Sequence, residues 1–188
     1  MGARVIFEKR KGYGRAYKTG LESCAGDIIV TFDADNTYPT EIIGTYVKKL
    51  IESKADFITI NRFSRIERGA MSFVHKIGNK ILSTTMNLVF SLNVQDSQSG
   101  MWIMRNSFVN SIKLHSDDMC FSEELKIIAF KYFNSLEMAG RYSERTGSAK
   151  LATIRHGWRN LRFLFTYRKL LNHAVLRREA PPETIEIT

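Results

Sequence analysis

The chain has 188 residues, enough for one domain with a sizeable core, and its 44% hydrophobic and 25% charged residues are ordinary for a globular protein. Its formal net charge of +9 indicates a polyanionic partner, such as nucleic acid, an anionic membrane surface or a phosphorylated substrate. Two distant cysteines, Cys24 and Cys120, exclude a disulfide framework and favour a reducing, cytoplasmic setting. No stretch approaches the ~20 apolar residues of a transmembrane helix.

The first part of the chain alternates strand and helix patterns. We expect a strand at 4–7, a helix from Arg15 to about Cys24, a strand at 28–32, a helix at 41–53 and a strand at 56–61. This order predicts an α/β fold with a parallel sheet and right-handed crossovers. The basic turn before the first helix contains Gly12 and Gly14, and it is either a phosphate cradle at a helix N-terminus or a flexible turn.

Two carboxylates, Asp33 and Asp35, end the apolar run at 28–32. Such a run is typical of a buried parallel strand, and ligands of open α/β sheets bind at the carboxyl ends of strands. Because hard cations such as Mg²⁺ take carboxylate oxygens together with substrate phosphates, the pair is a candidate metal site. The alternative is a solvated strand end with an Asx turn before Asn36.

The second part predicts a charged loop at 62–69, a long helix at 71–90, a polar turn at 94–100 and a strand at 101–104. A short helix at 107–112, a helix from Ser122 to Tyr132 and a last strand at 136–139 follow. The long helix has an apolar stripe that includes Val74, Ile77 and Ile81, with Lys76 on another face. In the polar turn, Gln98 offers a neutral oxygen ligand, unless the turn is only hydrogen-bonded internally.

The end of the chain is basic. The loop at 145–150 suits closure over a phosphate, or else is a solvated loop. Residues 154–178 predict a basic amphipathic helix or helix pair, which suits a membrane interface or packing on the domain core. We therefore expect a domain at 1–153, a helical segment at 154–178 and a disordered tail at 179–188.

The order of these motifs carries a resemblance. The glycine turn is followed by Phe32–Pro39, Ile60–Arg62, Lys76–Asn79, Asp96–Gly100, Phe121–Glu124 and Tyr142–Leu151. In this order the set resembles family 2 glycosyltransferases, and among them the polyprenyl (dolichyl)-phosphate hexose synthases. The resemblance implies a GT-A fold: a mixed, mostly parallel sheet flanked by helices, here truncated at its N-terminus. It implies a missing nucleotide-binding segment of about 60 residues before Arg4, so that the chain is a fragment or a truncated copy.

The implied reaction transfers a hexose, with inversion, from a GDP- or UDP-linked sugar to a polyprenyl phosphate. The implied location is cytoplasmic, peripherally associated with an anionic membrane surface, and nucleic acid is not expected as a partner. The resemblance implies that Asp33, Asp35 and Gln98 bind the Mg²⁺ or Mn²⁺ ion that holds the donor diphosphate. The other implied site residues are Asp35 and Arg145 as catalytic groups, and Arg62, Lys76, Lys150 and Gly14 in substrate binding.

Within that set, Lys76 stands where arginine is usual. Two alternative functions remain open. A family 2 transferase with a glycan or lipid hydroxyl acceptor needs a general base, for which Glu124 is the candidate. An inactive truncated copy acts only as a basic module that binds a membrane or a partner. If no hydroxyl acceptor is used, Glu123 and Glu124 are interpreted as negative charges that stabilise a helix N-terminus.

Overall fold

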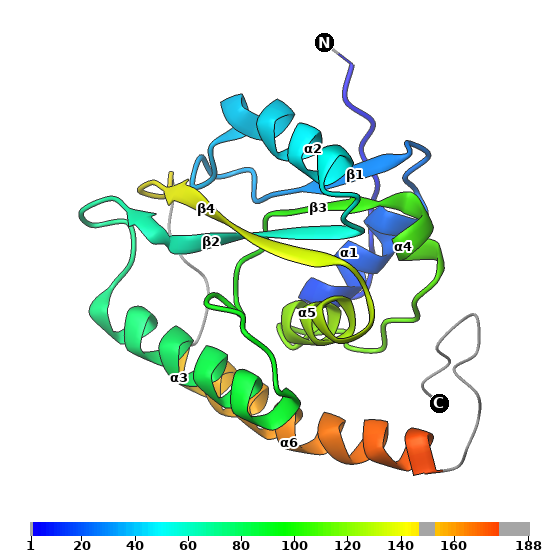
Figure 1. The fold of residues 1–188 in the computed structure, drawn as a ribbon. Coiled ribbons are helices and arrows are strands. Elements are labelled where there is room, and N and C mark those ends of the chain that lie inside the picture. Colours follow the sequence, from blue (N-terminus) through cyan, green and yellow to red (C-terminus); the bar gives the residue numbers. More distant parts are fainter. Residues whose placement is uncertain (1, 147–152, 177–188) are drawn as a thin grey trace.

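The computed structural model describes residues 2–146 and 153–176, with side chains of the last helix described at 155–171 (Figure 1). The helices are α1 (Tyr13–Glu22), the 3-10 helix η1 (Thr40–Ile42), α2 (Ile43–Glu52), α3 (Phe73–Phe90), α4 (Asn106–Asn110), α5 (Phe121–Tyr132) and α6 (Thr153–Leu176). The strands are β1 (Ile28–Thr31), β2 (Phe57–Ile66), β3 (Trp102–Arg105) and β4 (Ser135–Tyr142).

The described strands form one sheet in the order β1-β3-β2-β4. β3 pairs antiparallel with both β1 and β2, whereas β2 and β4 pair in parallel. Three strands therefore run one way and β3 the other, which confirms a mixed, mostly parallel α/β sheet. The all-parallel sheet that the strand–helix order predicted is wrong, because β3 lies between β1 and β2. Its residues Trp102, Ile103 and Met104 are fully buried, which suits a central strand.

Strand β1 is less enclosed than its apolar sequence predicts. It is an edge strand of the described sheet and pairs antiparallel with β3, so the prediction of a buried parallel strand is wrong. Ile29 is buried, but Phe32, just after the strand, is largely exposed. In the acid-rich turn that follows, Ala34 and Asn36 are exposed, whereas Asp33 and Asp35 are half-buried.

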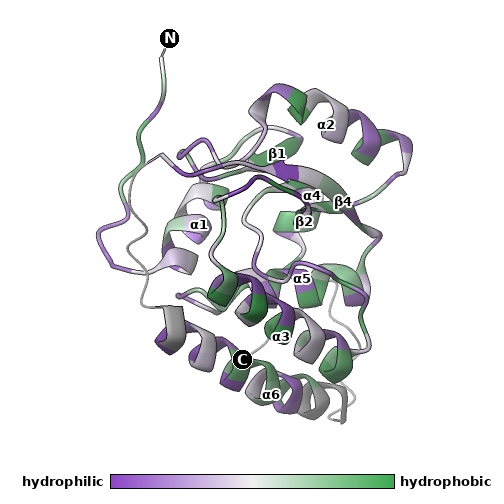
Figure 2. Cartoon of the chain, turned by 90° about the vertical axis from the view of Figure 1, so that its left-hand side faces the viewer, coloured by the Kyte–Doolittle hydropathy of each residue, from purple (hydrophilic) through white to green (hydrophobic). Residues whose placement is uncertain are grey.

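Helices cover the sheet in layers (Figures 1 and 2). α2 lies on one face, where Tyr46 and Leu50 pack with residues of β2 and β3. α1, α4 and α5 lie on the other face, and the core there includes Leu21, Phe108, Phe121 and Leu125. α3 and α6 lie side by side beyond α5, and the three helices share a third cluster of Met86, Phe90, Ile127, Ile128, Leu164 and Tyr167. The layers bring α3 and α6 to the side of the sheet opposite α2.

Two element predictions need correction. Residues 4–7, predicted as a strand, have no regular structure, because no described strand lies beside them to pair with their backbone. The loop predicted at 62–69 is largely the end of β2, which continues past a register shift until Ile66 pairs with Tyr142. Within the described residues, the basic helix predicted at 154–178 is present as α6, while residues 177–178 and the predicted tail at 179–188 lie outside them.

Candidate active site

Asp33 and Asp35 lie just beyond the carboxyl end of β1, as the sequence predicts. Oδ1 of Asp35 accepts hydrogen bonds from the backbone N–H and the hydroxyl of Thr37, at 3.2 and 2.6 Å. Asn36, which lies between Asp35 and Thr37, has a left-handed backbone conformation with φ of 64°. The turn considered as the alternative to a metal site is therefore present. It fixes the carboxylate of Asp35 while leaving Oδ2 for another partner.

The two carboxylates influence each other electrostatically. Burial, and then the negative charge of Asp35, raise the pKa of Asp33 above its ordinary value. The positive charges of Arg145 and Arg62 act in the opposite direction and lower that pKa. Two acids and two arginines from three segments of the chain therefore share one electrostatic environment.

Arg145 approaches the acid pair from the segment that follows β4. Its Nε lies 3.0 Å from Oδ2 of Asp35. The backbones join as well, since the N–H of Thr146 donates to the carbonyl of Asp35 and the N–H of Ser143 donates to the carbonyl of Thr37, both at 3.0 Å. The beginning of the predicted basic loop is thus held against the acid-rich turn. Lys150, predicted in the same loop, lies outside the described residues.

Arg62 has a protein partner that the sequence did not indicate. Its Nε and Nη2 donate to the two carboxylate oxygens of Asp96 at 2.7 and 2.8 Å, and its backbone N–H donates at 3.0 Å. The guanidinium carbon also lies 5.3 Å from the centre of the Tyr142 ring. Although burial opposes it, Arg62 keeps the pKa of Asp96 below its ordinary value. The predicted contact of Arg62 with an acceptor phosphate stays a prediction.

Gln98 lies between two helices. Its Nε2 donates to Oε1 of Glu123 on α5, and its Oε1 accepts from Nδ2 of Asn160 on α6, both at 2.9 Å. The oxygen proposed as a metal ligand therefore already accepts a hydrogen bond from α6. A carbonyl oxygen has a second acceptor direction, so metal ligation by Gln98 stays a prediction. The role of Asn160 was missed because a lone asparagine in a basic helix gives no signal in the sequence.

The two glutamates at the start of α5 are both buried and have different surroundings. Glu124 accepts from the backbone N–H groups of His115 and Ser116, at 3.0 and 2.7 Å, so both oxygens of its carboxylate fix the preceding loop. The general-base role considered for Glu124 stays a prediction. In Glu123, Oε2 has no hydrogen-bond partner among the described residues, and burial raises the pKa to about 8.

A buried lysine supports the polar turn from below. Lys126 is fully buried, and its Nζ donates to the carbonyls of Asp96 and Ser99, at 2.6 and 3.0 Å. These contacts fix both sides of Gln98 in the Asp96–Gly100 turn. The sequence did carry a signal, because Lys126 stands among apolar residues of the helix at 122–132, a position where lysine is rare unless it has partners.

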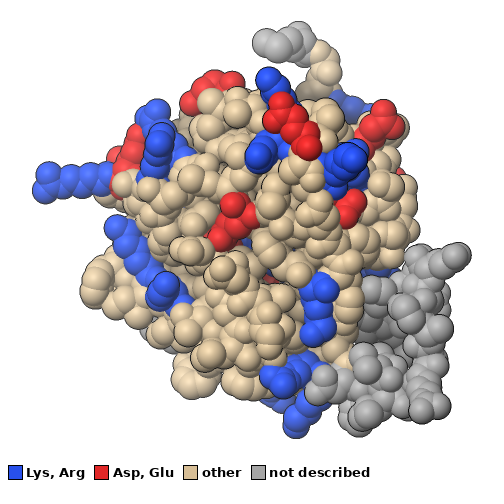
Figure 3. All heavy atoms as spheres, viewed as in Figure 1, with Lys and Arg blue, Asp and Glu red and all other residues tan. Residues whose placement is uncertain are grey.

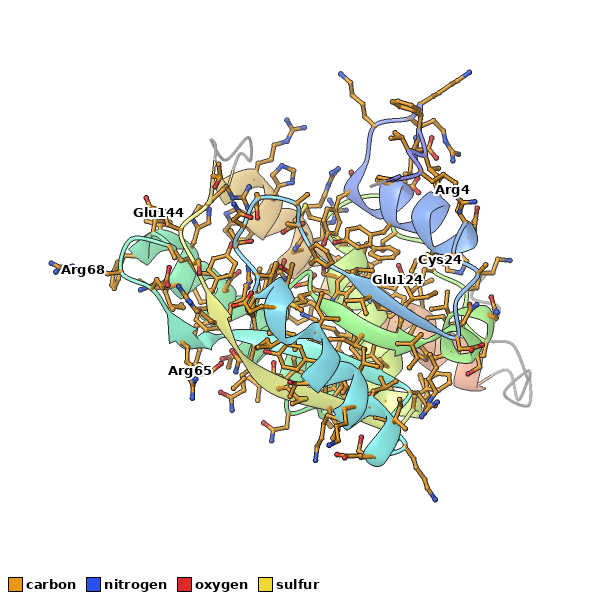
Figure 4. All side chains as sticks on the ribbon, turned by 90° about the horizontal axis from the view of Figure 1, so that it is seen from above. Arg4, Cys24, Arg65, Arg68, Glu124 and Glu144 are labelled. Carbon is orange, nitrogen blue, oxygen red and sulfur yellow. The ribbon has the colours of Figure 1, made fainter. Side chains whose placement is uncertain are left out.

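A cleft of about 410 Å³ opens beside these groups. Arg62, Gln98 and Arg145 line it on the side of the sheet, and α3 and α6 contribute His75, Asn79, Leu82, His156, Gly157 and Asn160. Lys76 is not among the residues that line the cleft and is exposed on α3, and its predicted place near the acceptor phosphate stays a prediction. Figure 4 shows Arg65 and Arg68 pointing into solvent at the end of the molecule where Glu144, another lining residue, lies.

Gly14 has a packing role in the structure. A Cβ at this position would lie 2.2 Å from the carbonyl oxygen of Ser116 and 2.9 Å from Cβ of Phe121. The start of α1 is also occupied, since the N–H of Arg15 donates to the carbonyl of Asp117 at 3.2 Å. Of the two possibilities considered for this turn, a phosphate cradle would have to share the helix start with the loop at 116–117. Substrate binding through Gly14 stays a prediction.

The donor set for a metal ion is small. Among the side chains described at 2–146 and 155–171, no three histidine, cysteine, aspartate or glutamate groups converge. The acid pair nevertheless fits a divalent cation, because burial and mutual repulsion disfavour two negative charges there and Arg145 supplies only one positive charge. Two carboxylates plus oxygens of a substrate are a typical set for Mg²⁺.

Comparison with known proteins gives consistent relatives. A family model described as glycosyl transferase family 2 matches residues 1–112. The chain is 32% identical over 166 residues to the low-salt glycan biosynthesis hexosyltransferase Agl6 of Haloferax volcanii, which covers 87% of this chain and 40% of that protein. It is 29% identical over 153 residues to the dolichyl-phosphate hexose transferase of the same organism, with 80% and 65% covered. The chain thus spans less than two thirds of either relative.

Solved structures show the same fold at low sequence identity. Glucosyl-3-phosphoglycerate synthase from Mycobacterium tuberculosis, in complex with Mn²⁺, UDP-glucose and phosphoglyceric acid, matches with a TM-score of 0.63 and 15% identity over 87% of this chain and 57% of that one. Its complex with Mg²⁺ and UDP matches with a TM-score of 0.62 at 16% identity, covering 86% and 56%. The GT-A fold expected from the resemblance is confirmed. Since the family model matches more than half of the chain, this chain belongs to glycosyl transferase family 2.

Proposed function

We propose that this chain forms the metal-binding and acceptor-binding part of a hexosyltransferase. The reaction moves a hexose, with inversion, from a GDP- or UDP-linked sugar to a polyprenyl phosphate at a membrane surface. The observation that carries the proposal is the acid pair at the end of β1, joined to Arg145 and opening beside a cleft of about 410 Å³. The chain spans less than two thirds of the length of these relatives, so the proposal is confined to the part of the reaction that the described residues can serve.

The acid pair suits the donor side. Asp33 and Asp35 would hold Mg²⁺ or Mn²⁺, which supplies charge neutralisation for the diphosphate leaving group. The solved neighbours that were crystallised with UDP and Mn²⁺ or Mg²⁺ support this assignment. Arg145 adds a cation next to Asp35, and a guanidinium group can bind phosphate oxygens in a bidentate manner. In this arrangement, Arg145 exchanges part of its contact with Asp35 for contact with the donor diphosphate.

The cleft suits a phosphate acceptor that carries an apolar chain. Its lining combines Arg145, His75 and His156 with apolar residues such as Met71 and Leu82. A phosphate acceptor is already an anion at neutral pH, so positioning replaces a strong general base. In support of this, the carboxylate of Glu124, the candidate base for a hydroxyl acceptor, is held by two backbone N–H groups. The relative named as a dolichyl-phosphate hexose transferase supports the same acceptor class.

The test compares sugar transfer and metal binding in the full-length protein and its Asp35→Ala variant. We expect transfer to polyprenyl phosphate to fall below detection, and Mn²⁺ binding measured by calorimetry to weaken, with an unchanged far-UV circular dichroism spectrum. Transfer at the wild-type rate by the variant would reject the role of the acid pair. Offering a sugar hydroxyl acceptor in parallel tests the acceptor class, and preference for that acceptor would overturn the polyprenyl phosphate assignment.

A further inference from the structure

The amide of Gln98 is the one side-chain group of residues 96–100 that lines the cleft. Its Nε2 donates hydrogen bonds to Oε1 of Glu123 at 2.9 Å and to Oγ of Ser97 at 3.1 Å. Its Oε1 accepts one hydrogen bond, at 2.9 Å, from Nδ2 of Asn160. A primary amide has two N–H donors and an oxygen that can accept twice. Both donors are used, so the capacity that remains is one acceptor direction on the oxygen.

The direction of this amide is set by the groups at its two ends. Asn160 presents its N–H groups to Gln98, because its own Oδ1 accepts from the thiol of Cys120, with Sγ 3.3 Å away. Turning the Gln98 amide over would place N–H groups against each other at the Asn160 end, whatever the protonation state of Glu123. At the other end it would place the amide oxygen against the carboxylate of Glu123. Loss of hydrogen bonds in a buried site opposes such a turn.

The backbone that carries Gln98 is fixed as well. The N–H of Ser97 donates to Oγ of Ser83 on α3, and the N–H of Gly100 donates to the hydroxyl of Tyr38, both at 2.9 Å. The hydroxyl of Ser83 also donates to that of Ser97, at 3.1 Å. These contacts act together with the buried lysine beneath the turn. The amide therefore cannot change its direction through a shift of the turn unless contacts with several elements break.

The groups that hold the amide lie inside the molecule. Glu123 and Lys126 are fully buried, and Asn160 is 2% exposed. In Figure 3 the lower part of the molecule, where α3 lies in Figure 1, is tan and blue, and the buried carboxylate of Glu123 does not contribute to that surface. Water therefore does not compete for the hydrogen bonds of Gln98 with Glu123 and Asn160, which strengthens them.

Helix α6 forms part of the wall of the cleft. Its inward side buries Leu164 and Tyr167 against α3 and α5, and Asn160 continues that side toward the cleft. Positions 160, 164 and 167 share one side of a helix. Among the described residues, no helix, α6 included, is long and apolar enough to cross a membrane. Packing on the domain core, one of the two roles considered for residues 154–178, brings Asn160 to the polar turn.

We propose that Glu123 and Asn160 are positioning residues that make Gln98 present an oxygen, and no N–H group, to the ligand in the cleft. An acceptor oxygen binds a divalent cation or a hydroxyl group of a hexose, because both approach a lone pair. It does not bind a phosphate oxygen, which needs a donor. The inference rests on the proposed function, which supplies the cation and the hexose. It leaves the phosphate to basic residues of the cleft such as Arg145.

Stability measurements test the direction of the amide. In Asn160→Asp a carboxylate replaces the N–H group that faces Gln98, so the midpoint of urea unfolding should fall. Adding Glu123→Gln should restore the midpoint, because the amide can then turn over and find a partner at each end. We call Asn160→Asp/Glu123→Gln the swapped pair, and it keeps the formal charge of the wild type. The measurement is made at pH 9, above the pKa of about 8 of Glu123, so that no carboxyl proton repairs the mismatch.

Ligand binding separates a positioning role from a merely structural one. Gln98→Leu removes the oxygen, and the swapped pair turns it away from the ligand. Both should weaken binding by about tenfold, the size of one hydrogen bond. Calorimetry on the full-length protein uses Mn²⁺ alone, and then UDP-glucose and GDP-mannose in turn with Mn²⁺ present. Weaker Mn²⁺ binding identifies the cation as the ligand of Gln98, whereas weaker binding of the sugar nucleotide alone identifies a hydroxyl group.

Ser83→Ala is the matched control, because it removes a support of the turn and leaves both partners of the amide in place. It should lower the midpoint of unfolding and leave both affinities unchanged. A wild-type midpoint for Asn160→Asp, no rescue by Glu123→Gln, or wild-type affinities in Gln98→Leu or in the swapped pair would each overturn the proposal. Failure of the proposed function looks different: Asp35→Ala would then transfer sugar at the wild-type rate, while the unfolding results, which need no ligand, would stand.

Discussion

Arg145 and Asp35 form an ion pair at the end of β1, with Nε 3.0 Å from Oδ2. The two side chains come from opposite ends of the described sheet, since Asp35 follows β1 and Arg145 follows β4. The pair is only partly buried, with about a third of the Arg145 side chain exposed. Because arginine and a metal ion would both use the carboxylate of Asp35, they compete for it in the absence of a substrate.

This competition predicts opposite effects of Arg145→Ala on metal binding and on transfer. Without the guanidinium, Mn²⁺ should bind up to about fivefold more tightly, which corresponds to the roughly 1 kcal/mol of a partly exposed ion pair. Sugar transfer should fall, because the donor diphosphate loses a cation. Calorimetry with Mn²⁺ and a transfer assay on the full-length protein measure the two effects.

Arg141→Ala serves as the control for that experiment. Arg141 is also on this part of the chain, but its partner is Glu67, and both side chains are well exposed. Its loss should change neither Mn²⁺ affinity nor transfer. Weaker Mn²⁺ binding in the Arg145→Ala variant would show that the arginine supports the metal site and does not compete with it.

The sequence predicted the acid pair and the family because these depend on short local patterns. An apolar run that ends in Asp33 and Asp35 is visible without knowing its neighbours. The position of β3 was not predictable in this way, because insertion of Trp102–Arg105 between β1 and β2 depends on contacts between distant segments. The same limit explains why the partners of Arg62 and Gln98 were missed.

Helical periodicity identified the elements better than it identified their buried sides. In α3 both sides carry apolar residues, so the pattern does not reveal whether Ile81 or Met86 faces the core. Only packing against α5 and α6 decides this, and it buries Met86. The exposed residues of α3 therefore became visible as a surface only in the folded chain.

Breaking the Arg62–Asp96 pair should be costly to the fold. Arg62→Met leaves Asp96, whose side chain is fully buried, without the partner that binds both its oxygens. Removing one member of a buried pair costs about 3–5 kcal/mol, so the free energy of unfolding should fall by that amount. Urea denaturation followed by circular dichroism provides the measurement.

A double variant separates loss of the pair from loss of packing. Replacing both partners, as in Arg62→Met/Asp96→Leu, removes the unpaired charge and should recover much of the lost stability. The surface pair of Arg141 and Glu67 is the reference, because Arg141→Ala should lower the free energy of unfolding by no more than about 1 kcal/mol. Equal effects of Arg62→Met and Arg141→Ala would contradict the buried-pair explanation.

Gly14 and Gly20 of α1 should respond in opposite directions to alanine. At Gly14 the new Cβ would lie 2.2 Å from the carbonyl oxygen of Ser116, so α1 must shift, at a cost of about 1–3 kcal/mol. At Gly20 nothing lies within 4 Å, and alanine should stabilise the helix by up to about 1 kcal/mol. Thermal unfolding of both variants measures the difference, and a neutral Gly14→Ala would argue against the packing role.

Lys126 should make stability depend on pH. Burial lowers the pKa of Lys126 to about 7 in the folded chain, whereas an unfolded lysine has a pKa of about 10.4. Between these values the unfolded chain binds a proton that the folded chain does not, so stability rises with pH by up to about 1.4 kcal/mol per unit. A neutral amine retains two N–H groups, enough for the carbonyls of Asp96 and Ser99.

The Lys126→Met variant should therefore lose this rise between pH 7 and pH 9, as measured by urea unfolding at each pH. It should also be less stable overall, because two buried carbonyls lose their donor, so the slope and not the absolute value is the diagnostic quantity. Lys131→Met, at an exposed position near the end of the same helix, is the control and should keep the wild-type slope. A wild-type slope in Lys126→Met would mean that Lys126 stays protonated in the folded chain, held by the negative charges of Asp96 and Glu137.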